Sequence, residues 1–441
     1  MATPPTDLRR ARRINMLVLL STTAAIVTSR FLWWRVLPIY FRDLGATDQQ
    51  VAIIYSVTLV LLLFQIVGGL ISDRWGRRYS IGIPTLLVGP ALVLAVISTD
   101  WRLVAISVWS VGVIQGLQGP GFQALLAESA TDEDRGRLFG LFFMIQASSQ
   151  MIGPALGAAF LAGSGFLPVL NVQQLIWTTI VIATLAGVVR LLFLREGQFN
   201  DAAQAAATRT SIGEILSRPA IRWLIGIHAM YMVLMGITFE GPFIALHLAD
   251  TVMLPEIQIE ETINLLFAVG GVGGIVAALI GGALTDRLTG QRTSVIFLIT
   301  HVVGLIVWSW FGLNSTLGYI LFALSWMALW MGQVAHSSWT SAYAPTAIRG
   351  RVLGLMGAIG AILSAFGPTV GNLMRTAASN FVMAQFGESV LGERVASGMP
   401  FVLALAIVFL LAYGISQIPA REVQQGVSGR LAAADPIAPQ R

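Results

Sequence analysis

Three charged residues lie deep inside long apolar runs of the sequence: Arg30, Arg35 and Glu240. A charge at the centre of a membrane span costs about 2.5–3.5 kcal/mol on insertion scales, so such residues are candidates for function. Glu240 is the only deep carboxylate in the second half of the chain, and the first half has none. We therefore expect Glu240 to exchange a proton, with Arg30 as its electrostatic partner. The alternative is that Glu240 only neutralises an arginine in a structural ion pair.

The two arginines cannot share one helix face. Their separation corresponds to about 140° around a helix and about 7.5 Å along it. Arg30, with Trp34 at i+4 on its face, is expected to line a substrate cavity. Arg35 is assigned to the same cavity, and the alternative is that it extends to the outer interface. His247 follows Glu240 at i+7 on the same stripe. The remaining histidines are expected to be packing residues: His228, His301 and His336. No two histidines of the chain have a spacing suited to a metal.

Two other runs carry polar and aromatic side chains at helical spacing. One stripe consists of Trp326, Trp330, Gln333, Ser337 and Ser341. A second face combines amides and a ring beside a row of small residues: Gln115, Gln118 and Phe122, with Gly112, Gly116 and Gly119. Indole faces with a few amide groups suit an amphipathic organic molecule, and a cation in particular. The alternative is that the tryptophans are only interfacial anchors, where this residue type is enriched.

The composition shows what kind of elements must hold these residues. Of 441 residues, 56% are hydrophobic and 11% are charged, whereas soluble domains carry roughly 25% charged residues. This excludes a soluble enzyme, a disordered chain and a nucleic-acid-binding domain, and a net charge of +5 makes no basic patch. The absence of cysteine excludes disulfides and thiolate metal sites. The lipid bilayer is the expected solvent.

The apolar runs predict an all-α polytopic membrane protein. A helix needs about 20 apolar residues to cross the bilayer, and continuous rather than alternating runs disfavour strands. We count twelve predicted spans, at 14–41, 48–71, 79–98, 102–128, 137–161, 170–194, 220–248, 262–285, 293–312, 316–343, 351–377 and 398–418.

The positive charges predict the orientation of these spans. Every one of the 27 positive residues is arginine, and about 21 fall on the side of the N-terminus against about 4 on the other, a strong positive-inside bias. The basic segment before the first span does not look like a cleavable signal, because the run after it is too long. We therefore expect a plasma-membrane protein with both termini in the cytoplasm.

The two halves of the chain repeat each other in order. The segment GGLISDRWGRR at 68–78 corresponds to GGALTDRLTGQR at 281–292, and Arg-Gly-Arg at 135–137 corresponds to 349–351. A Gly-Pro-x-x-Gly pattern occurs in both halves, at Gly153, Pro154 and Gly157 and at Gly367, Pro368 and Gly371. We expect it to bend each helix, because proline removes one backbone hydrogen bond. The repeat predicts a duplicated six-helix unit. The expected divisions are a bundle at 1–194, a linker at 195–219, a bundle at 220–418 and a tail at 419–441.

These motifs resemble those of the major facilitator superfamily, and the drug and metabolite efflux branch in particular. The strongest match is Gly69-x-x-x-Asp73-Arg74-x-Gly76-Arg77-Arg78, and the Gly-Pro-x-x-Gly pattern resembles the family's antiporter motif. The family's span-4 arginine is missing, since Gly112 occupies its position. The resemblance implies two bundles related by a pseudo-two-fold axis, with spans 1, 4, 7 and 10 lining a cavity. It also implies a cytoplasmic gate that latches the bundles in the outward-open state, formed by Gly69, Asp73, Arg74, Gly76, Arg77, Arg78, Glu128, Arg135, Asp286 and Arg287.

The sequence thus predicts a secondary transporter that exports an amphipathic compound in exchange for protons. The expected partners are a small-molecule substrate, H⁺ and the bilayer, with no nucleic acid, no cofactor, no metal and no obligatory protein partner, so that a monomer suffices. Two alternatives stay open: an uptake permease or uniporter for a sugar or organic anion, and a non-transporting receptor. An enzyme is not expected because no catalytic acids or histidines cluster, and a nucleotide-driven pump lacks its phosphate-binding loop.

Overall fold

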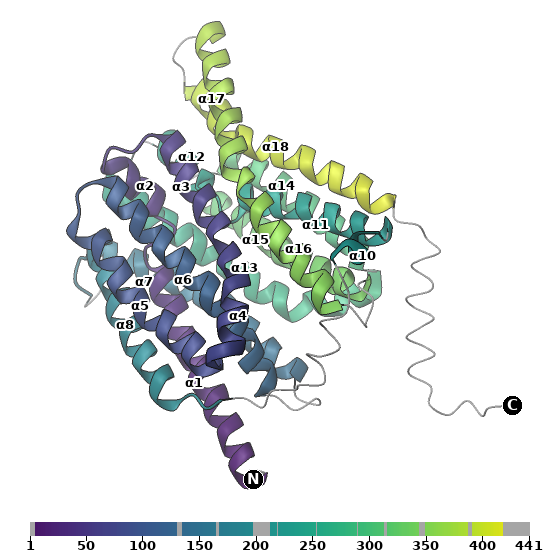
Figure 1. Cartoon of the computed structure of the whole chain (residues 1–441). Coiled ribbons are helices and arrows are strands. Elements are labelled where there is room, and N and C mark those ends of the chain that lie inside the picture. The colour runs from purple at the N-terminus through teal and green to yellow at the C-terminus, as the bar shows by residue number, and fades with distance from the viewer. Residues whose placement is uncertain are drawn as a thin grey trace, which may run out of the picture.

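The computed structural model describes residues 5–129, 135–164, 167–196, 212–217, 219–252, 254–288, 290–312, 315–343, 349–386 and 390–417. Within these ranges the chain is almost entirely helical and has no strand (Figure 1). The first half contains α1 (Pro5–Phe31), α2 (Leu37–Asp43), α3 (Asp48–Leu61), α4 (Gln65–Trp75), α5 (Arg77–Ile97), α6 (Trp101–Glu128), α7 (Arg135–Ala162) and α8 (Val172–Phe193).

The second half repeats this arrangement after a short helix, α10 (Ile212–Ser217), in the predicted linker. It contains α11 (Pro219–Thr238), α12 (Phe243–Thr251), α13 (Glu256–Leu288), α14 (Gly290–Val307), α15 (Thr316–Tyr343), α16 (Arg349–Ser364), α17 (Phe366–Phe386) and α18 (Val390–Ser416). In Figure 1 the purple-to-blue helices of the first half pack beside the teal-to-yellow helices of the second.

The helices confirm the predicted all-α membrane fold. Eleven segments of the described chain are long and apolar enough to cross a membrane. The remaining predicted span, 137–161, coincides with the 28-residue helix α7. Helices pack mainly within their own half, but α7 and α13 also pack against each other across the two bundles.

Two spans that the sequence predicts as continuous are broken. The first span, expected over 14–41, stops at Phe31 and resumes as α2 at Leu37; the seventh, expected over 220–248, stops at Thr238 and resumes as α12 at Phe243. Pro38 is the second residue of α2 and Pro242 precedes α12, and a proline lacks the N–H that a continuous helix would bond to residue i−4. The turn at the second break also needs Gly241, since a Cβ there would lie 2.4 Å from the Gly236 carbonyl oxygen.

The two ends of the molecule carry different residues, and we name them accordingly. The motif side is the end that carries Asp73 to Arg78, where α4 meets α5 and where α1 begins. The distal side is the opposite end, where α2 meets α3 and α12 ends. The sequence predicts that the motif side is cytoplasmic.

The glycines of the Gly-Pro-x-x-Gly patterns pack closely against the broken spans. A Cβ on Gly157 of α7 would lie 2.3 Å from the Leu32 carbonyl oxygen, in the first break. In the second half, a Cβ on Gly371 of α17 would lie 2.5 Å from the ring of Phe243, which opens α12. The pattern therefore provides close approach to the neighbouring break in each bundle. In the second copy the span is interrupted at Ala365, between α16 and α17, whereas in the first copy α7 continues through Pro154 as one helix.

This packing makes Gly157→Ala a sensitive test of the break. The added methyl group meets backbone, which cannot move aside as a flexible side chain would, so overpacking is expected to destabilise the protein by about 1–3 kcal/mol. Thermal unfolding of the purified protein should show a lower melting temperature for this variant. Gly119→Ala is the matched control, because nothing lies within 4 Å of the Cβ it would add. Equal melting temperatures for the two variants would contradict the close approach.

Candidate substrate and coupling site

The two broken spans face each other, and each bundle satisfies the other's break. Arg35 of the first break donates from Nη1 to the Phe239 carbonyl oxygen at 2.9 Å, in the second break. In return, Asn264 of α13 donates from Nδ2 to the Leu32 carbonyl oxygen at 3.0 Å. Backbone carbonyls freed by a helix break need such partners within a membrane. The breaks therefore form one joint between the bundles, in the kind of place where transporters bind substrate.

Arg35 lies in an aromatic cage at this joint. Its guanidinium carbon is 4.3 Å from the ring centre of Phe267, and three further rings lie within 6 Å, those of Phe31, Phe239 and Trp326. The residue is only 6% exposed. Arg35 therefore lies at the joint instead of extending to the outer interface, and its assignment to a substrate cavity stays a prediction. The cation stays buried because ring faces and the Phe239 carbonyl together replace part of its hydration.

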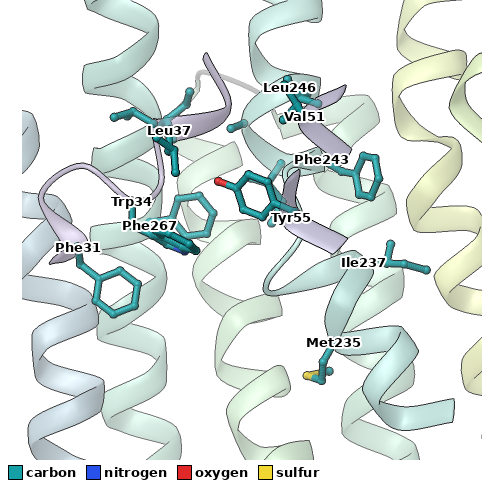
Figure 2. Packing of buried hydrophobic residues seen from close by; sticks show 14 of the residues in the cluster. Phe31, Trp34, Leu37, Val51, Tyr55, Met235, Ile237, Phe243, Leu246 and Phe267 are labelled. Carbon is teal, nitrogen blue, oxygen red and sulfur yellow. The ribbon is translucent and has the colours of Figure 1, made fainter. Parts of the chain in front are cut away.

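Arg30 makes the contacts that the cavity prediction requires. Its Nη1 donates to Gln115 Oε1 at 3.2 Å, and its guanidinium carbon lies 4.1 Å from the ring centre of Trp34. Trp34 in turn lies beside Tyr55, with ring centres 5.8 Å apart (Figure 2). The buried Nε of Arg30 has no hydrogen-bond partner among the described residues. An unsatisfied donor of this kind is available to a ligand that offers an acceptor.

Glu240 lies in the break of the seventh span and is partly exposed. It interacts electrostatically with both Arg30 and Arg35. Among the described residues, however, no ion pair within 4.0 Å joins it to either arginine. The structural ion pair proposed as an alternative is therefore absent from the described contacts. Glu240 is placed between two buried positive charges without being locked to one of them.

The predicted stripe on α15 divides between core and cavity. Trp326 is 1% exposed and stacks on Phe322 at 4.9 Å, so it belongs to the core that surrounds Arg35. Trp330 and Gln333 are partly exposed, and Trp330 meets Phe239 edge to face at 6.1 Å. These two stay candidates for substrate contact. Ser337 is exposed, and the side chain of Ser341 lies outside the described part.

The predicted face on α6 also divides. Gln115 meets Arg30, whereas Gln118 Oε1 lies 3.0 Å from Thr85 Oγ1, in a different network. At the centre of that network is Arg190 of α8, which is 2% exposed and lies over the ring of Phe122. Its guanidinium group donates to the hydroxyls of three threonines, Thr22, Thr23 and Thr85. Sequence reasoning missed this buried charge because Arg190 is near the end of a span and counts as a loop arginine.

His247 is a packing residue rather than a neighbour of Glu240 in a cavity. Its Nδ1 lies 2.8 Å from Ser397 Oγ and its Nε2 lies 3.1 Å from the Ser309 carbonyl oxygen. Both ring nitrogens are thus satisfied inside the second bundle, and the residue is 1% exposed. The expectation that His247 continues the Glu240 stripe is wrong because the break between α11 and α12 changes the phase of the helix.

The gate motif on the motif side is centred on Arg77. Its Nη1 contacts Asp73 at 2.9 Å and its Nε contacts Glu128 at 3.4 Å, so it joins α4, α5 and α6 of the first bundle. Partial burial raises the pKa of the Glu128 carboxyl, and the charge and hydrogen bond of Arg77 offset part of that rise. The proposed latch between bundles stays a prediction. Three further residues of the predicted gate have side chains outside the described part: Arg135, and Asp286 and Arg287 of the second copy.

The loop of this motif depends on a residue that sequence reasoning did not select. Gly76 has a φ of +85°, which side chains rarely adopt, and starts α5. The carboxylate of Glu196 accepts from the backbone N–H groups of Arg77 and Arg78 at 2.9 and 3.2 Å. A carboxylate at a helix N-terminus is favourable because it meets unpaired N–H groups. Glu196 therefore fixes the Arg77 loop to the end of the first bundle.

A second charged cluster, which we call the distal charge ring, joins the bundles on the distal side. Arg42 of α2 contacts Asp48 of α3 at 2.6 Å and Asp250 of α12 at 2.8 Å. Arg375 of α17 pairs with the same two carboxylates from the other side. Each arginine thus bridges one carboxylate from each bundle, and each carboxylate accepts from both arginines. Beside the ring is a cavity of about 320 Å³.

Two bundles of membrane-length helices, joined at facing breaks, define the architecture of secondary transporters. The chain belongs to the Major Facilitator Superfamily, whose model matches residues 19–368. This confirms the predicted family and its fold. Members of this family are membrane transporters rather than enzymes.

Two curated relatives are drug-resistance proteins. The chain is 25% identical over 303 residues to the multidrug resistance protein MdtG of Enterobacter lignolyticus, covering 65% of this chain and 68% of MdtG. It is 24% identical over 123 residues to the quinolone resistance protein NorA of Staphylococcus aureus, covering 28% of this chain and 32% of NorA. The match to NorA thus spans about a third of that protein.

Solved structures of transporters share the fold. A bacterial homologue of the human lysosomal transporter Spinster, in an inward-facing and unoccupied conformation, superposes with a TM-score of 0.71 at 14% identity. That match covers 95% of this chain and 99% of the homologue. The nucleoside transporter NupG, as a D323A variant, gives a TM-score of 0.71 at 12% identity, covering 92% and 99% of the two chains. At these identities the likeness shows the fold alone.

Proposed function

We propose that this protein exports an amphipathic organic compound across the plasma membrane in exchange for protons. The observation that carries the proposal is Glu240, a partly exposed carboxylate in a helix break, between Arg30 and Arg35 and without a described ion pair. Such a group can bind a proton in one conformation and release it in the other. The similarity to MdtG and NorA supports efflux as the direction.

The proposed substrate surface lies on the aromatic side chains around the joint. Trp34 and Trp330 provide ring faces, while Gln115, Gln333 and the unpartnered Nε of Arg30 provide polar contacts. A mostly apolar site with a few placed polar groups is typical for small organic ligands. With both termini in the cytoplasm, the motif side faces the cytoplasm, as the arginine distribution predicts.

The distal charge ring supports a conformation closed toward the outside. Among the described residues, the hydrogen bonds between bundles run from the breaks to the distal end, and include Ser56 with Thr369 at 2.8 Å. In this conformation Glu240 releases its proton toward the motif side and substrate binds. Opening of the ring then exposes the site outward, where proton binding to Glu240 favours substrate release. Alternation between the two states couples the two fluxes.

A second candidate function has one specific observation in its favour. Arg35 is buried and Arg30 partly buried, and neither has a described ion pair. The Nε of Arg30, which has no partner among the described residues, suits an anionic or polyhydroxylated ligand. This favours uptake or facilitated movement of an organic anion or a sugar. A receptor that binds solute without moving it is the third and least supported reading.

Reconstitution in liposomes separates these functions. Flux of ethidium, benzoate and glucose would be followed with and without an imposed pH gradient, with protein-free liposomes as the background. Export in exchange for protons predicts saturable ethidium flux that reverses with the sign of the gradient. Gradient-independent flux of benzoate or glucose would instead support the second candidate, and binding without any flux would support a receptor.

A further inference from the structure

Two histidines in the second bundle face each other away from the joint. His228 of α11 and His336 of α15 place Nδ1 and Nε2 3.2 Å apart, within hydrogen-bond distance. Their rings are nearly parallel, at 19°, with centres 5.4 Å apart. His336 is 1% exposed, while His228 is partly exposed. One imidazole must therefore donate its single N–H to the other when both are neutral.

Aromatic rings enclose this pair. Tyr231 of α11 stacks on His336 with ring centres 4.0 Å apart and planes at 16°, and Trp339 meets the same ring edge to face at 5.5 Å. In the described part of the chain, His336 Nδ1 and the Tyr231 hydroxyl have no hydrogen-bond partner. A ring face above an imidazole stabilises its charged form, as it does other cations.

The pair differs from the other two histidines of the chain. His247 has both ring nitrogens bonded to fixed oxygens, and His301 Nδ1 faces the carbonyl and hydroxyl oxygens of Ser325 at 3.0 and 2.9 Å. Bonding to backbone carbonyls fixes the position of an N–H and so fixes a neutral tautomer. In the pair, by contrast, the partner of each imidazole is a second base, which can accept or donate the shared proton.

No charged side chain outside the pair is a described electrostatic partner of the two histidines. In the described part, the group that interacts electrostatically with His336 is His228, and no carboxylate or guanidinium is a partner of either ring. Tyr231 of α11 is a further titratable group, and its ring lies beside both imidazoles. From α16, Gly360 packs on His228, where an added Cβ would lie 3.1 Å from Nε2.

We propose that His228 and His336 together form a proton-binding site, additional to Glu240, on the motif side of the joint. A proton from water adds to a ring lone pair, forming one N–H bond, and the resulting imidazolium donates to the neutral partner. The reverse step returns the proton to water, so no other reactant is needed. The site rests on the proposed function for its role in coupling, but not for proton binding itself.

The position of the pair links it to the substrate surface. His228 lies on the helix that ends at the Glu240 break, and His336 lies six residues beyond Trp330 on α15, about 9 Å along the helix. A charge gained by the pair therefore changes the contact between α11 and α15 beside the proposed cavity. Its expected effect is to shift the pH dependence of transport rather than to carry the flux.

Nitrogen-15 NMR of histidine in the full-length protein in lipid nanodiscs tests the site directly. His301→Gln and His247→Gln assign the two packing histidines and serve as controls. Across the pH range in which the protein stays folded, we expect the two remaining imidazoles to titrate together in two steps, because interacting sites share their titration. His336→Gln should convert the His228 curve to a single step.

Two results would overturn the proposal: neutral signals for both rings across that range, or a His228 curve that does not change when His336 is replaced. The wild-type titration decides by itself if the variant fails to fold. The outcome is also separable from that of the proposed function. A coupled titration in a protein without gradient-driven flux refutes proton-coupled export only, whereas gradient-driven flux with two neutral rings refutes only the histidine site.

Discussion

Glu240→Gln is expected to abolish flux driven by a pH gradient while leaving substrate binding largely intact. The amide keeps the size and most of the polarity of the carboxyl group but cannot bind a proton at any working pH. Its place between Arg30 and Arg35, without a described ion pair, means that the substitution breaks no salt bridge of the described joint. We expect at least a tenfold loss of gradient-driven ethidium flux in liposomes, which corresponds to a barrier to transport that is higher by about 1.4 kcal/mol or more.

The matched control for this variant is Glu261→Gln. Glu261 is also a partly exposed glutamate, near the start of α13, but unlike Glu240 it has no described interaction with Arg30 or Arg35. The Glu261→Gln variant should retain wild-type flux. Binding of ethidium to purified protein, measured by fluorescence, should be retained by all three proteins, and it should lose its pH dependence only in Glu240→Gln. Wild-type gradient-driven flux in Glu240→Gln would remove Glu240 from the coupling mechanism.

Asp250→Asn is expected to open the distal side. Asp250 accepts from Arg42 and Arg375 at once, so its replacement leaves Asp48 as the one described carboxylate for both arginines. Charge-assisted pairs that are partly buried are stronger than exposed ones. A loss of one to two kcal/mol changes a two-state ratio by a factor of about 5–30. The outward-open population should rise by that factor.

The chain contains no cysteine, so this population can be measured with two introduced spin labels and no background. Exposed positions on the two sides of the ring are Gln49 and Asn380. Electron–electron double resonance between labels at Gln49→Cys and Asn380→Cys should show a longer distance that gains population in Asp250→Asn. Asp100→Asn, which removes a distal-side carboxylate outside the ring, is the control. An unchanged distance distribution in Asp250→Asn would contradict a gating role for the ring.

The family and its helical fold were predictable from the sequence because they rest on run lengths, charge bias and repeated motifs. Arg30, Trp34 and Gln115 were correctly grouped because helical spacing places them on cavity-facing sides of their spans. The facing breaks were not predicted, because Leu32 to Val36 and Phe239 to Pro242 lie inside long apolar runs that read as continuous spans. Helical spacing extended through a break misplaces the side chains that follow it, which is why the cage around Arg35 was not predicted.

The remaining misses share one physical cause: the partner is distant in sequence. Asn264 gains its importance from the Leu32 carbonyl oxygen, and Arg190 from three threonines of other helices. A single asparagine in the apolar run 262–285 was the available signal for the first of these. The distal charge ring joins Arg375, in the middle of α17, to charges near the ends of α2, α3 and α12, and the sequence shows all four only as ordinary charges at or beyond the ends of the predicted spans.

Proton release on substrate binding tests the central claim most directly. Ethidium would be added to purified, weakly buffered protein, with a pH indicator in solution, and the released protons counted against bound ethidium. Competition at Glu240 predicts about one proton released per ethidium bound by the wild type near the pH where Glu240 is protonated, and none from Glu240→Gln. Binding without proton release by the wild type across the pH range, or equal release by both proteins, would contradict coupling through Glu240.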